Sequence, residues 1–336
     1  MDVVVLHGPR DARIEREPDL EGSPGPREIQ IRTLVTALSS GTELTVYTGR
    51  YGDGMYGWPF GYPTEMGYLN VGRVVAVGEA VQPTEAAPWD VVYTFKPHRQ
   101  EYRHSVDELF WKVPSGLAPE RAAFAYLINL GLHALRRGGL QPGEKVAIVG
   151  LGPIGLAAAM LAKHFGSAVL AVDPVAERRA LARQLGADLA LDPTTAEFAA
   201  QAAQFGGETG IDLVVEAAST WSAVRTAAEL VRQEGRISIV ALHPGEAEFN
   251  PLGQLFYEKQ YSLISTSFTP RADFPPERTR FTLRRNIQDI LDKLAREELP
   301  YATAITGSIP HLELPALYER LAQGDRSAGA IAIHWE

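Results

Sequence analysis

A glycine-rich turn between an apolar run and a predicted helix is the segment of this chain best suited to chemistry. Residues 145–155 read KVAIVGLGPIG, so a predicted strand leads into the pattern G-x-G-x-x-G and a helical stretch leads out of it. In that context the glycines form a tight turn, let the backbone approach a pyrophosphate and let the helix pack on the strand. The helix start offers unpaired N–H groups to the phosphates. The residues expected at the phosphates are Gly150, Gly152, Pro153, Ile154 and Gly155.

An acidic residue completes this dinucleotide fingerprint. The next apolar run, residues 168–172, ends in Asp173, and an acid about 20 residues beyond the glycines accepts hydrogen bonds from a ribose 2′-hydroxyl. The same carboxylate repels a 2′-phosphate, so the pattern predicts NAD(H) in preference to NADP(H). The alternative is a turn that merely packs a helix on a strand, and it leaves the agreement of these features unexplained.

The composition is that of a globular protein long enough for two domains. The chain has 336 residues, of which 45% are hydrophobic and 22% charged, and two domains of such a chain can each bury a core. The net charge of −9 argues against nucleic-acid or anionic-membrane partners, which require basic surfaces. Because the chain has no cysteine, disulfides and thiolate metal sites are excluded. With neither a secretory signal nor a long apolar run, we expect a cytoplasmic protein.

The pattern of elements changes near residue 120. Before it, short strands at 3–6, 28–37, 72–77 and 90–95 alternate with turns, which favours a compact β-barrel. After it, a helix at 119–137 is followed by alternating strands and helices, which predicts a parallel sheet covered on both faces. Its expected strands are 145–150, 168–172, 188–191, 211–217, 236–242 and 261–267, and its expected helices are 153–166, 175–186, 195–205 and 220–233. The closing elements, helices at 277–296 and 314–323 and a strand at 328–334, break this order, so we assign them to the first domain.

These residues resemble the medium-chain dehydrogenases/reductases over essentially the whole chain. Ser40-Gly-Thr-Glu-Leu44 lies where the zinc enzymes of that family have Cys-Gly-(Thr/Ser)-Asp, and Gly67-Tyr-Leu-Asn-Val-Gly72 lies where they have Gly-His-Glu-x-x-Gly. Residues 141–150 match the lead-in to the coenzyme loop. The resemblance implies an α/β chain with a GroES-like β-barrel catalytic domain, residues 1–122 and 272–336, and a doubly wound Rossmann domain, residues 123–271.

The departures from that family concern the metal. The catalytic zinc ligands would fall at Ser40, Tyr68 and about Ala125, none of which is a good zinc ligand. The short segment 96–103 stands in place of the four-cysteine lobe that holds a structural zinc. The resemblance therefore implies that this chain binds no zinc. Within the family, residues 38–78 look closest to the zinc-free branch that contains bacteriochlorophyllide dehydrogenase.

Without a metal, a hydrogen-bond donor must stabilise or protonate the substrate oxygen during hydride transfer. Tyr68 is the first candidate, because a phenol of pKa about 10 can act as an acid if its neighbours lower that value. The alternative is that its ring fills the space of the missing histidine. Thr42 matches the family's hydroxyl that relays a proton between substrate and coenzyme ribose, the alternative being a local role in a turn.

Two further groups could assist Tyr68. Glu43 could orient it or carry protons, or could be a solvated carboxylate at a turn. His98 belongs to a loop expected near the cleft, where a histidine of pKa about 6.5 is a ready proton shuttle, or it could lie on the surface. His133 and His164, on expected helices, are assigned structural roles.

Further coenzyme contacts are expected from the sheet edge and from register with the family. The carboxyl ends of parallel strands bind ligands, which selects Ala217, Ala218, Ala241, Leu242 and, within Ser265–Ser267, Thr266. Arg178 matches a basic residue that the family uses at the adenosine ribose, although it could be a charge on a helix face. Asn129 falls by register near the nicotinamide carboxamide.

The segment 47–62 is unusually aromatic, with Tyr47, Tyr51, Tyr56, Trp58, Phe60 and Tyr62 among glycines. It could form a lid over a large or flat apolar substrate, or pack on itself, or make a subunit contact. The sequence thus predicts a zinc-independent oxidoreductase acting between NAD(H) and an alcohol or carbonyl compound, in a chain that forms a homodimer as its family often does. A quinone or enoyl reductase is the nearest alternative, and a non-catalytic NAD(H)-binding protein is the alternative of another class.

Overall fold

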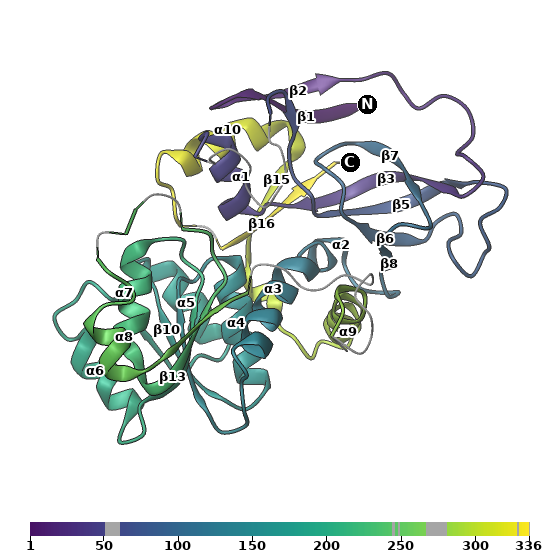
Figure 1. Cartoon of the computed structure of the whole chain (residues 1–336). Helices are drawn as coiled ribbons and strands as arrows, with labels where there is room; N and C mark the ends of the chain where they lie inside the picture. The colour runs from purple at the N-terminus through teal and green to yellow at the C-terminus, as the bar shows by residue number, and fades with distance from the viewer. Residues whose placement is uncertain (51–60, 244–245, 248, 267–280, 328, 336) are drawn as a thin grey trace.

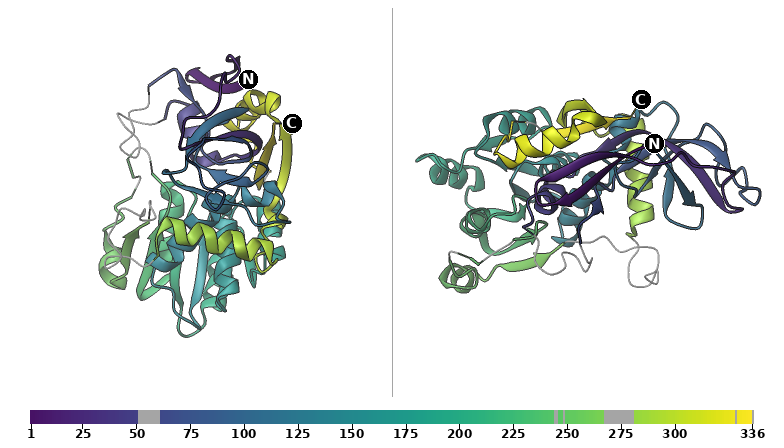
Figure 2. Two further views of the ribbon diagram at one scale, coloured as in Figure 1. Left: turned by 90° about the vertical axis from the view of Figure 1, so that its right-hand side faces the viewer. Right: turned by 90° about the horizontal axis from the view of Figure 1, so that it is seen from above.

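The computed structural model describes residues 1–50, 61–243, 246–247, 249–266, 281–327 and 329–335. Its described part has a parallel sheet with helices on both faces at one end and a group of mostly antiparallel strands at the other (Figure 1). The first and last strands both lie in the antiparallel part (Figure 2). None of the helices in these residues combines the length and apolar character needed to cross a membrane.

The parallel sheet has the strand order β11-β10-β9-β12-β13-β14, and every neighbouring pair runs parallel. The order reverses between β9 and β12, the point at which such sheets bind ligands. Its strands are β9 (Lys145–Val149), β10 (Ala168–Val172), β11 (Leu189–Leu191), β12 (Ile211–Glu216), β13 (Val231–Ile239) and β14 (Ser262–Ser265). The Rossmann fold expected from the alternating pattern is confirmed.

Two hydrophobic cores lie on the two faces of this sheet. Because successive strand residues point to opposite faces, Val146 and Ile148 join the core beneath one set of helices, while Ala147 and Val149 join the other. The first set comprises α3 (Ala125–Arg137), α4 (Pro153–His164) and α5 (Ala176–Gln184), and the second α6 (Phe198–Gly206), α7 (Trp221–Leu230) and the short α8 (Gln254–Lys259). The helix α2 (Pro119–Ala122) precedes them.

The antiparallel part brings the two ends of the chain together. One sheet has the order β15-β16-β3-β5-β6-β8 with β7 beside β3, and a smaller one has the order β2-β1-β4. The last strand pairs antiparallel with β3, so residues that close the sequence lie beside its first forty. The strands are β1 (Asp2–Gly8), β2 (Asp11–Arg16), β3 (Glu28–Ala37), β4 (Thr64–Glu65), β5 (Asn70–Val77), β6 (Val91–Thr94), β7 (Glu101–Ser105), β8 (Phe110–Lys112), β15 (Ile305–Pro310) and β16 (Ala330–His334).

The remaining helical elements lie near the two ends of the sequence. The helix α9 (Leu283–Ala295) begins at Thr282, whose side chain accepts a hydrogen bond from the Arg285 N–H, and it packs against α3. The others are α1 (Ser40–Tyr47), α10 (Leu314–Ala322) and the 3₁₀ turns η1 (Tyr301–Ala304) and η2 (His311–Glu313).

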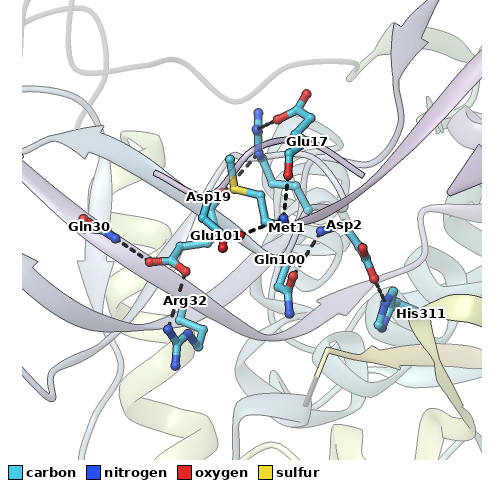
Figure 3. A network of polar contacts seen from close by, with 10 residues as sticks. Met1, Asp2, Glu17, Asp19, Gln30, Arg32, Gln100, Glu101 and His311 are labelled. Carbon is cyan, nitrogen blue, oxygen red and sulfur yellow. Dashed lines mark hydrogen bonds and ion pairs between the residues drawn. The ribbon is translucent and has the colours of Figure 1, made fainter. Parts of the chain in front are cut away.

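Polar contacts fasten β1 to distant segments (Figure 3). The Asp2 N–H donates to Gln100, and its carboxylate lies 3.1 Å from the Nε2 atom of His311 in η2. The His311 ring also stacks on Trp335, with centroids 4.5 Å apart. These contacts hold the first strand against the segment that follows β15.

Three expectations about local structure are corrected. The helix expected at 220–233 ends at Leu230 because Val231 already pairs with Ile211 as the start of β13. The turn expected around Thr42 is the helix α1. The helix expected from residue 277 begins at Leu283, residues 277–280 lying outside the described part. The division at residues 271–272 also falls outside it, so the domain boundaries stay a prediction.

Candidate active site

Each of the three glycines in the expected phosphate loop lacks a side chain for a different geometric reason. Gly150 has φ +92, and a Cβ there would lie 2.7 Å from the Cβ of Ala218. A Cβ on Gly155 would lie 1.8 Å from the carbonyl oxygen of Gly150. At Gly152 no atom of the described residues lies within 4 Å of such a Cβ. Turn and packing therefore require the outer two, while the middle one borders open space, as a loop approached by a pyrophosphate needs.

The start of α4 fits a bound anion. The helix begins at Pro153 after Gly152, which has no side chain to cap it. The first N–H groups of a helix lack intrahelical partners and lie at its positive end. The N–H groups that follow Pro153, beginning with that of Ile154, are therefore suited to the coenzyme's phosphates. The loop fits a dinucleotide at this point.

Asp173 holds the loop from the end of β10. Its side chain is almost completely buried, and its two oxygens accept from the N–H groups of Leu151 and Val175, each at 2.8 Å. Each oxygen keeps a further lone pair, since a carboxylate has about four acceptor positions. The carboxylate can therefore fix the loop and still accept from a ribose hydroxyl.

Arg178 lies beside this carboxylate rather than on a solvated helix face. One guanidinium nitrogen is 4.0 Å from the Asp173 carboxylate, and 17% of the side chain is exposed. Burial lowers the pKa of Arg178, and Asp173 opposes that change. The guanidinium borders a cavity of about 20 Å³ whose other lining residues include Ser40, Asp325 and Arg326. The cation thus faces the antiparallel part of the molecule.

The expected edge residues differ in their exposure. The Ala217 N–H bonds to the Val149 carbonyl at 2.8 Å, and Ala218 packs against Gly150. Ala241 is half-buried, whereas Leu242 is 47% exposed. The hydroxyl of Thr266 donates a hydrogen bond to the Ile239 carbonyl at 2.8 Å. Ser267 lies outside the described residues.

Asn129 is buried in α3 and tied to α9. Its side-chain oxygen accepts from the amide of Asn286 at 3.0 Å, and the Asn286 oxygen accepts from Arg136. These contacts join α3 and α9. They leave the expected contact with the carboxamide a prediction.

The Tyr68 hydroxyl is held by two neighbours. It lies 2.6 Å from Ser39 Oγ, and the Thr42 side chain also hydrogen-bonds to it. Its ring meets Tyr126 edge to face. Burial raises the pKa of Tyr68 well above its usual value, Tyr126 and Glu43 add to this, and the two hydroxyl contacts only partly oppose it. The neighbours therefore do not lower the pKa of Tyr68 in the protein alone, which is the condition set above for its action as an acid.

Glu43 and His98 form a buried pair instead of the exposed groups we considered. Glu43 is 2% exposed and His98 is 0% exposed, and a carboxylate oxygen lies 3.0 Å from His98 Nε2. The other ring nitrogen lies 2.7 Å from Thr36 Oγ1. With both nitrogens engaged inside the barrel, His98 does not face a cleft as expected. Glu43 is not a solvated carboxylate, because α1 turns its side chain inward.

The side chains at the family's zinc positions do not fit the metal. Ser40 begins α1 and offers a neutral hydroxyl, Tyr68 stays a phenol, and Ala125 is a fully buried methyl group. Zinc in proteins takes thiolate, imidazole or carboxylate ligands. Within the described part of the chain, no group of three or more His, Cys, Asp or Glu residues could hold a metal ion.

Sequence reasoning did not identify two partners at this site. Ser39 contacts the Tyr68 hydroxyl, and its position directly before the Ser-Gly-Thr-Glu motif was a usable signal. Tyr318 donates to Glu43 at 2.5 Å from a helix near the end of the chain. No local pattern around Tyr318 could have indicated that contact.

Comparisons with known proteins show which sequences and folds this chain is similar to. Residues 153–282 match the family Zinc-binding dehydrogenase. L-galactonate-5-dehydrogenase of Escherichia coli is 35% identical over 161 residues, covering 47% of this chain and 46% of the relative, so the match spans about half of that protein. Sorbitol dehydrogenase of Bacillus subtilis is 26% identical over 274 residues, covering 72% and 75%. The structure of galactitol-1-phosphate dehydrogenase from Escherichia coli aligns over 99% of this chain and 100% of its own, with a TM-score of 0.81 and 19% identity.

Residues 153–282 are thus similar to the zinc-binding dehydrogenases. The structural likeness shows the fold, a Rossmann domain joined to a GroES-like barrel. The matched segment 153–282 contains none of the three expected ligand positions, Ser40, Tyr68 and Ala125. The name of the matched family therefore says nothing about a metal at those three positions of this chain.

Proposed function

We propose that this protein is an NAD(H)-dependent oxidoreductase that interconverts an alcohol and a carbonyl compound without zinc. The observation that carries the proposal is the Tyr68 hydroxyl, held by Ser39 and Thr42 at a position where zinc enzymes of the family have a ligand. The phosphate loop and Asp173 support the coenzyme, and relatives named as dehydrogenases support the reaction class.

When bound, the coenzyme gives or takes the hydride. The chain's own residues then have three tasks. The loop around Gly152 and the start of α4 hold the phosphates, Asp173 accepts from the ribose, and the edge residues Ala217 and Ala218 border the cofactor. Because Asp173 repels a 2′-phosphate, we propose NAD(H) rather than NADP(H).

Tyr68 acts on the substrate oxygen as a hydrogen-bond donor. Because burial raises the pKa of Tyr68, its phenol keeps its proton at neutral pH. A donor aimed at an oxygen that gains negative charge stabilises the transition state most where water is excluded. We propose that in alcohol oxidation Tyr68 takes the alcohol proton while its own proton passes to Thr42, bonded to the same hydroxyl, and on to the coenzyme ribose. In carbonyl reduction the proton returns to the substrate oxygen by the same path. Glu43 and His98 are not proposed as proton carriers, because both side chains are buried and paired with each other.

Substrate choice is a proposal at the level of class. Relatives named for L-galactonate and sorbitol suggest polyols and sugar acids as the first compounds to test. The large or aromatic substrate suggested by residues 47–62 stays a prediction, because residues 51–60 lie outside the described part. At its ends, Tyr47 stacks on Tyr318 and the Tyr62 hydroxyl donates to the Val46 carbonyl.

The test combines binding, turnover and metal content. We expect NADH to bind more tightly than NADPH in fluorescence titrations, and NADH to be consumed with a member of a panel of sugar ketones, aromatic ketones, quinones and enones. We expect Tyr68→Phe to lower turnover at least tenfold with unchanged NADH affinity. Turnover on quinones or enones alone would favour the reductase alternative. Binding without turnover would favour a non-catalytic protein, and stoichiometric metal whose removal abolishes turnover would overturn the zinc-independent mechanism.

We also propose a homodimer through the β14 edge of the parallel sheet. This strand ends the sheet, and apolar side chains on it and on the preceding α8 segment are exposed: Leu252, Leu255, Tyr257 and Leu263. Exposed apolar groups on neighbouring elements are typical of protein interfaces. Light scattering should give the dimer mass, and Leu263→Lys should shift it to the monomer. A monomeric wild-type protein would contradict the proposal.

A further inference from the structure

We infer that Glu43 and His98 form a buried positioning pair that holds the Tyr68 hydroxyl in its reactive place, acting through Ser39 on one side and Gly67 on the other. The inference rests on the proposed function, because it assigns roles around the same hydroxyl. It is carried by contacts among five residues that form a closed circuit.

The first half of the circuit runs from Glu43 to the phenol. One Glu43 oxygen accepts from the Ser39 N–H at 2.7 Å. The hydroxyl of the same serine lies 2.6 Å from the Tyr68 hydroxyl. The carboxylate thus fixes the backbone of the residue that contacts the phenol. A shift of Glu43 would be passed to Tyr68 through one residue.

The second half runs through His98 to the backbone before Tyr68. Gly67 has φ +84, and a Cβ there would lie 2.3 Å from the ring carbon Cδ2 of His98. The ring therefore packs directly against the Gly67 backbone. In addition, the His98 N–H donates to the Met66 carbonyl at 2.7 Å. His98 thus supports residues 66–67 through its ring and through its backbone N–H. This support fixes the position of the backbone that leads into Tyr68.

The pair itself is locked by donors from three other elements. The Glu43 oxygen that faces His98 also accepts from Tyr318 of α10 at 2.5 Å. Thr36 Oγ1 accepts from Trp335 Nε1 at 3.0 Å and lies 2.7 Å from His98 Nδ1. We assign the His98 proton to Nε2, because the Glu43 carboxylate beside that nitrogen can only accept, and Thr36 then donates to Nδ1. Every polar atom of the pair has a partner, which a buried charge requires.

A purely structural pair is the competing explanation, because Glu43 and His98 also join α1, α10 and the barrel. Under that explanation, loss of the pair lowers stability, and turnover falls only as the folded fraction falls. Under the positioning role, turnover falls in the fully folded protein. Among the residues that the structure describes, the titratable groups that face the circuit are Tyr126 and Tyr93 beside Tyr68, and Tyr318 beside Glu43. The Glu43 charge raises the pKa of Tyr68, so removing it has a signature that loss of stability lacks.

The experiment uses Glu43→Gln in the full-length protein, with Tyr102→Phe as the matched control. Glutamine keeps the size and an acceptor for Ser39 but removes the charge. Tyr102 is a buried tyrosine of the same barrel, and its hydroxyl bonds to Thr94 and Asn70 and to none of the five residues of the circuit. We expect Glu43→Gln to lower kcat at least tenfold at temperatures where it is folded, with NADH affinity unchanged. We expect the alkaline limb of its pH profile to move to lower pH, and Tyr102→Phe to lose stability alone.

A readout without turnover separates failure of this inference from failure of the proposed function. Ultraviolet difference spectra of the apoprotein report tyrosine ionisation, and Tyr68→Phe identifies the contribution of Tyr68. We expect Tyr68 to ionise at lower pH in Glu43→Gln than in the wild type. An unchanged Tyr68 titration would overturn the inference even if the protein is an active dehydrogenase. A shifted titration in a protein without turnover would retain the circuit and reject the catalytic role.

Discussion

The hydroxyl of Tyr301 donates a hydrogen bond to the carbonyl oxygen of Pro153, 2.8 Å away. Tyr301 belongs to η1, which leads into β15, whereas Pro153 is the first residue of α4 after the phosphate loop. The phenol is fully buried, and its ring lies against that of Phe124. One side chain from the end of the sequence therefore fixes the start of the helix that is proposed to bind the coenzyme phosphates.

Tyr301→Phe should weaken NADH binding without unfolding the protein. The variant keeps the ring and removes one hydrogen bond, worth about 1 kcal/mol, which corresponds to a roughly fivefold rise in Kd if the bond serves the binding geometry. Fluorescence titration measures the change. Tyr102→Phe, which removes a buried hydroxyl elsewhere in the barrel, should leave Kd unchanged. Equal Kd values for wild type and Tyr301→Phe would mean that the contact serves stability alone.

Alanine at the inner and outer glycines of the loop should separate binding from folding. Gly152→Ala adds a methyl group where nothing in the described residues lies within 4 Å, and its φ of −71 suits alanine. We expect normal thermal stability and at least tenfold weaker NADH binding, because the methyl group meets the pyrophosphate.

Gly155→Ala is the matched contrast. Its Cβ would lie 1.8 Å from the Gly150 carbonyl oxygen, so the helix must move away from the turn. Such overpacking costs about 1–3 kcal/mol, and calorimetry should show a lower Tm. Wild-type NADH affinity in Gly152→Ala would argue against a phosphate site at this loop.

The fold was predictable because its signals are local. The run 145–155 contains a strand, a turn and a helix start within one short segment, and each glycine there has a geometric reason that its spacing indicates. Asp173 follows from the same rule, since the end of the neighbouring strand lies beside the turn. The alternation of strands with helices after residue 145 predicted the rest of the parallel sheet.

The surroundings of Tyr68 were harder to predict because they depend on contacts far apart in sequence. Glu43 looked like a solvated residue in a polar turn, yet its carboxylate accepts from Tyr318. His98 looked like a loop residue, yet its ring fills the space beside Gly67. Position in a motif assigned Tyr68 and Thr42 to one expected site, and the structure shows a hydrogen bond between their side chains. It could not indicate burial, and burial decides the direction of the Tyr68 pKa.

Asp173→Asn should reduce the preference for NADH over NADPH. The amide keeps one acceptor oxygen, but its N–H₂ group replaces the other. One of the backbone N–H groups of Leu151 and Val175 then faces a donor and loses its acceptor. It also removes the charge that repels a 2′-phosphate. We expect the ratio of Kd values for NADPH and NADH to fall about tenfold, equivalent to about 1.4 kcal/mol. Asp192→Asn, at the end of the next strand and bonded to Thr194, should leave the ratio unchanged.

Acid should destabilise the protein through His104 before its carboxylates protonate. His104 is 3% exposed, and a contact with the Leu109 backbone and the nearby Glu108 carboxylate only partly offset the effect of burial on its pKa. Burial lowers the pKa of His104 to about 4, with Lys96 acting in the same direction and Glu108, 3.5 Å away, too exposed to reverse it. The unfolded chain, with a pKa of about 6.5, therefore binds this proton more readily than the folded protein.

The stability that neutral His104 contributes is complete above about pH 6.5 and is lost as the pH falls toward 4. Between about pH 7 and pH 5 the loss should be about 2 kcal/mol, measured as a lower midpoint in urea unfolding. His104→Phe, which places an apolar ring beside Phe110, should remove that part of the pH dependence. His164→Gln changes an exposed histidine and should retain it. An acid loss of the same size in His104→Phe would show that other groups control stability in this range.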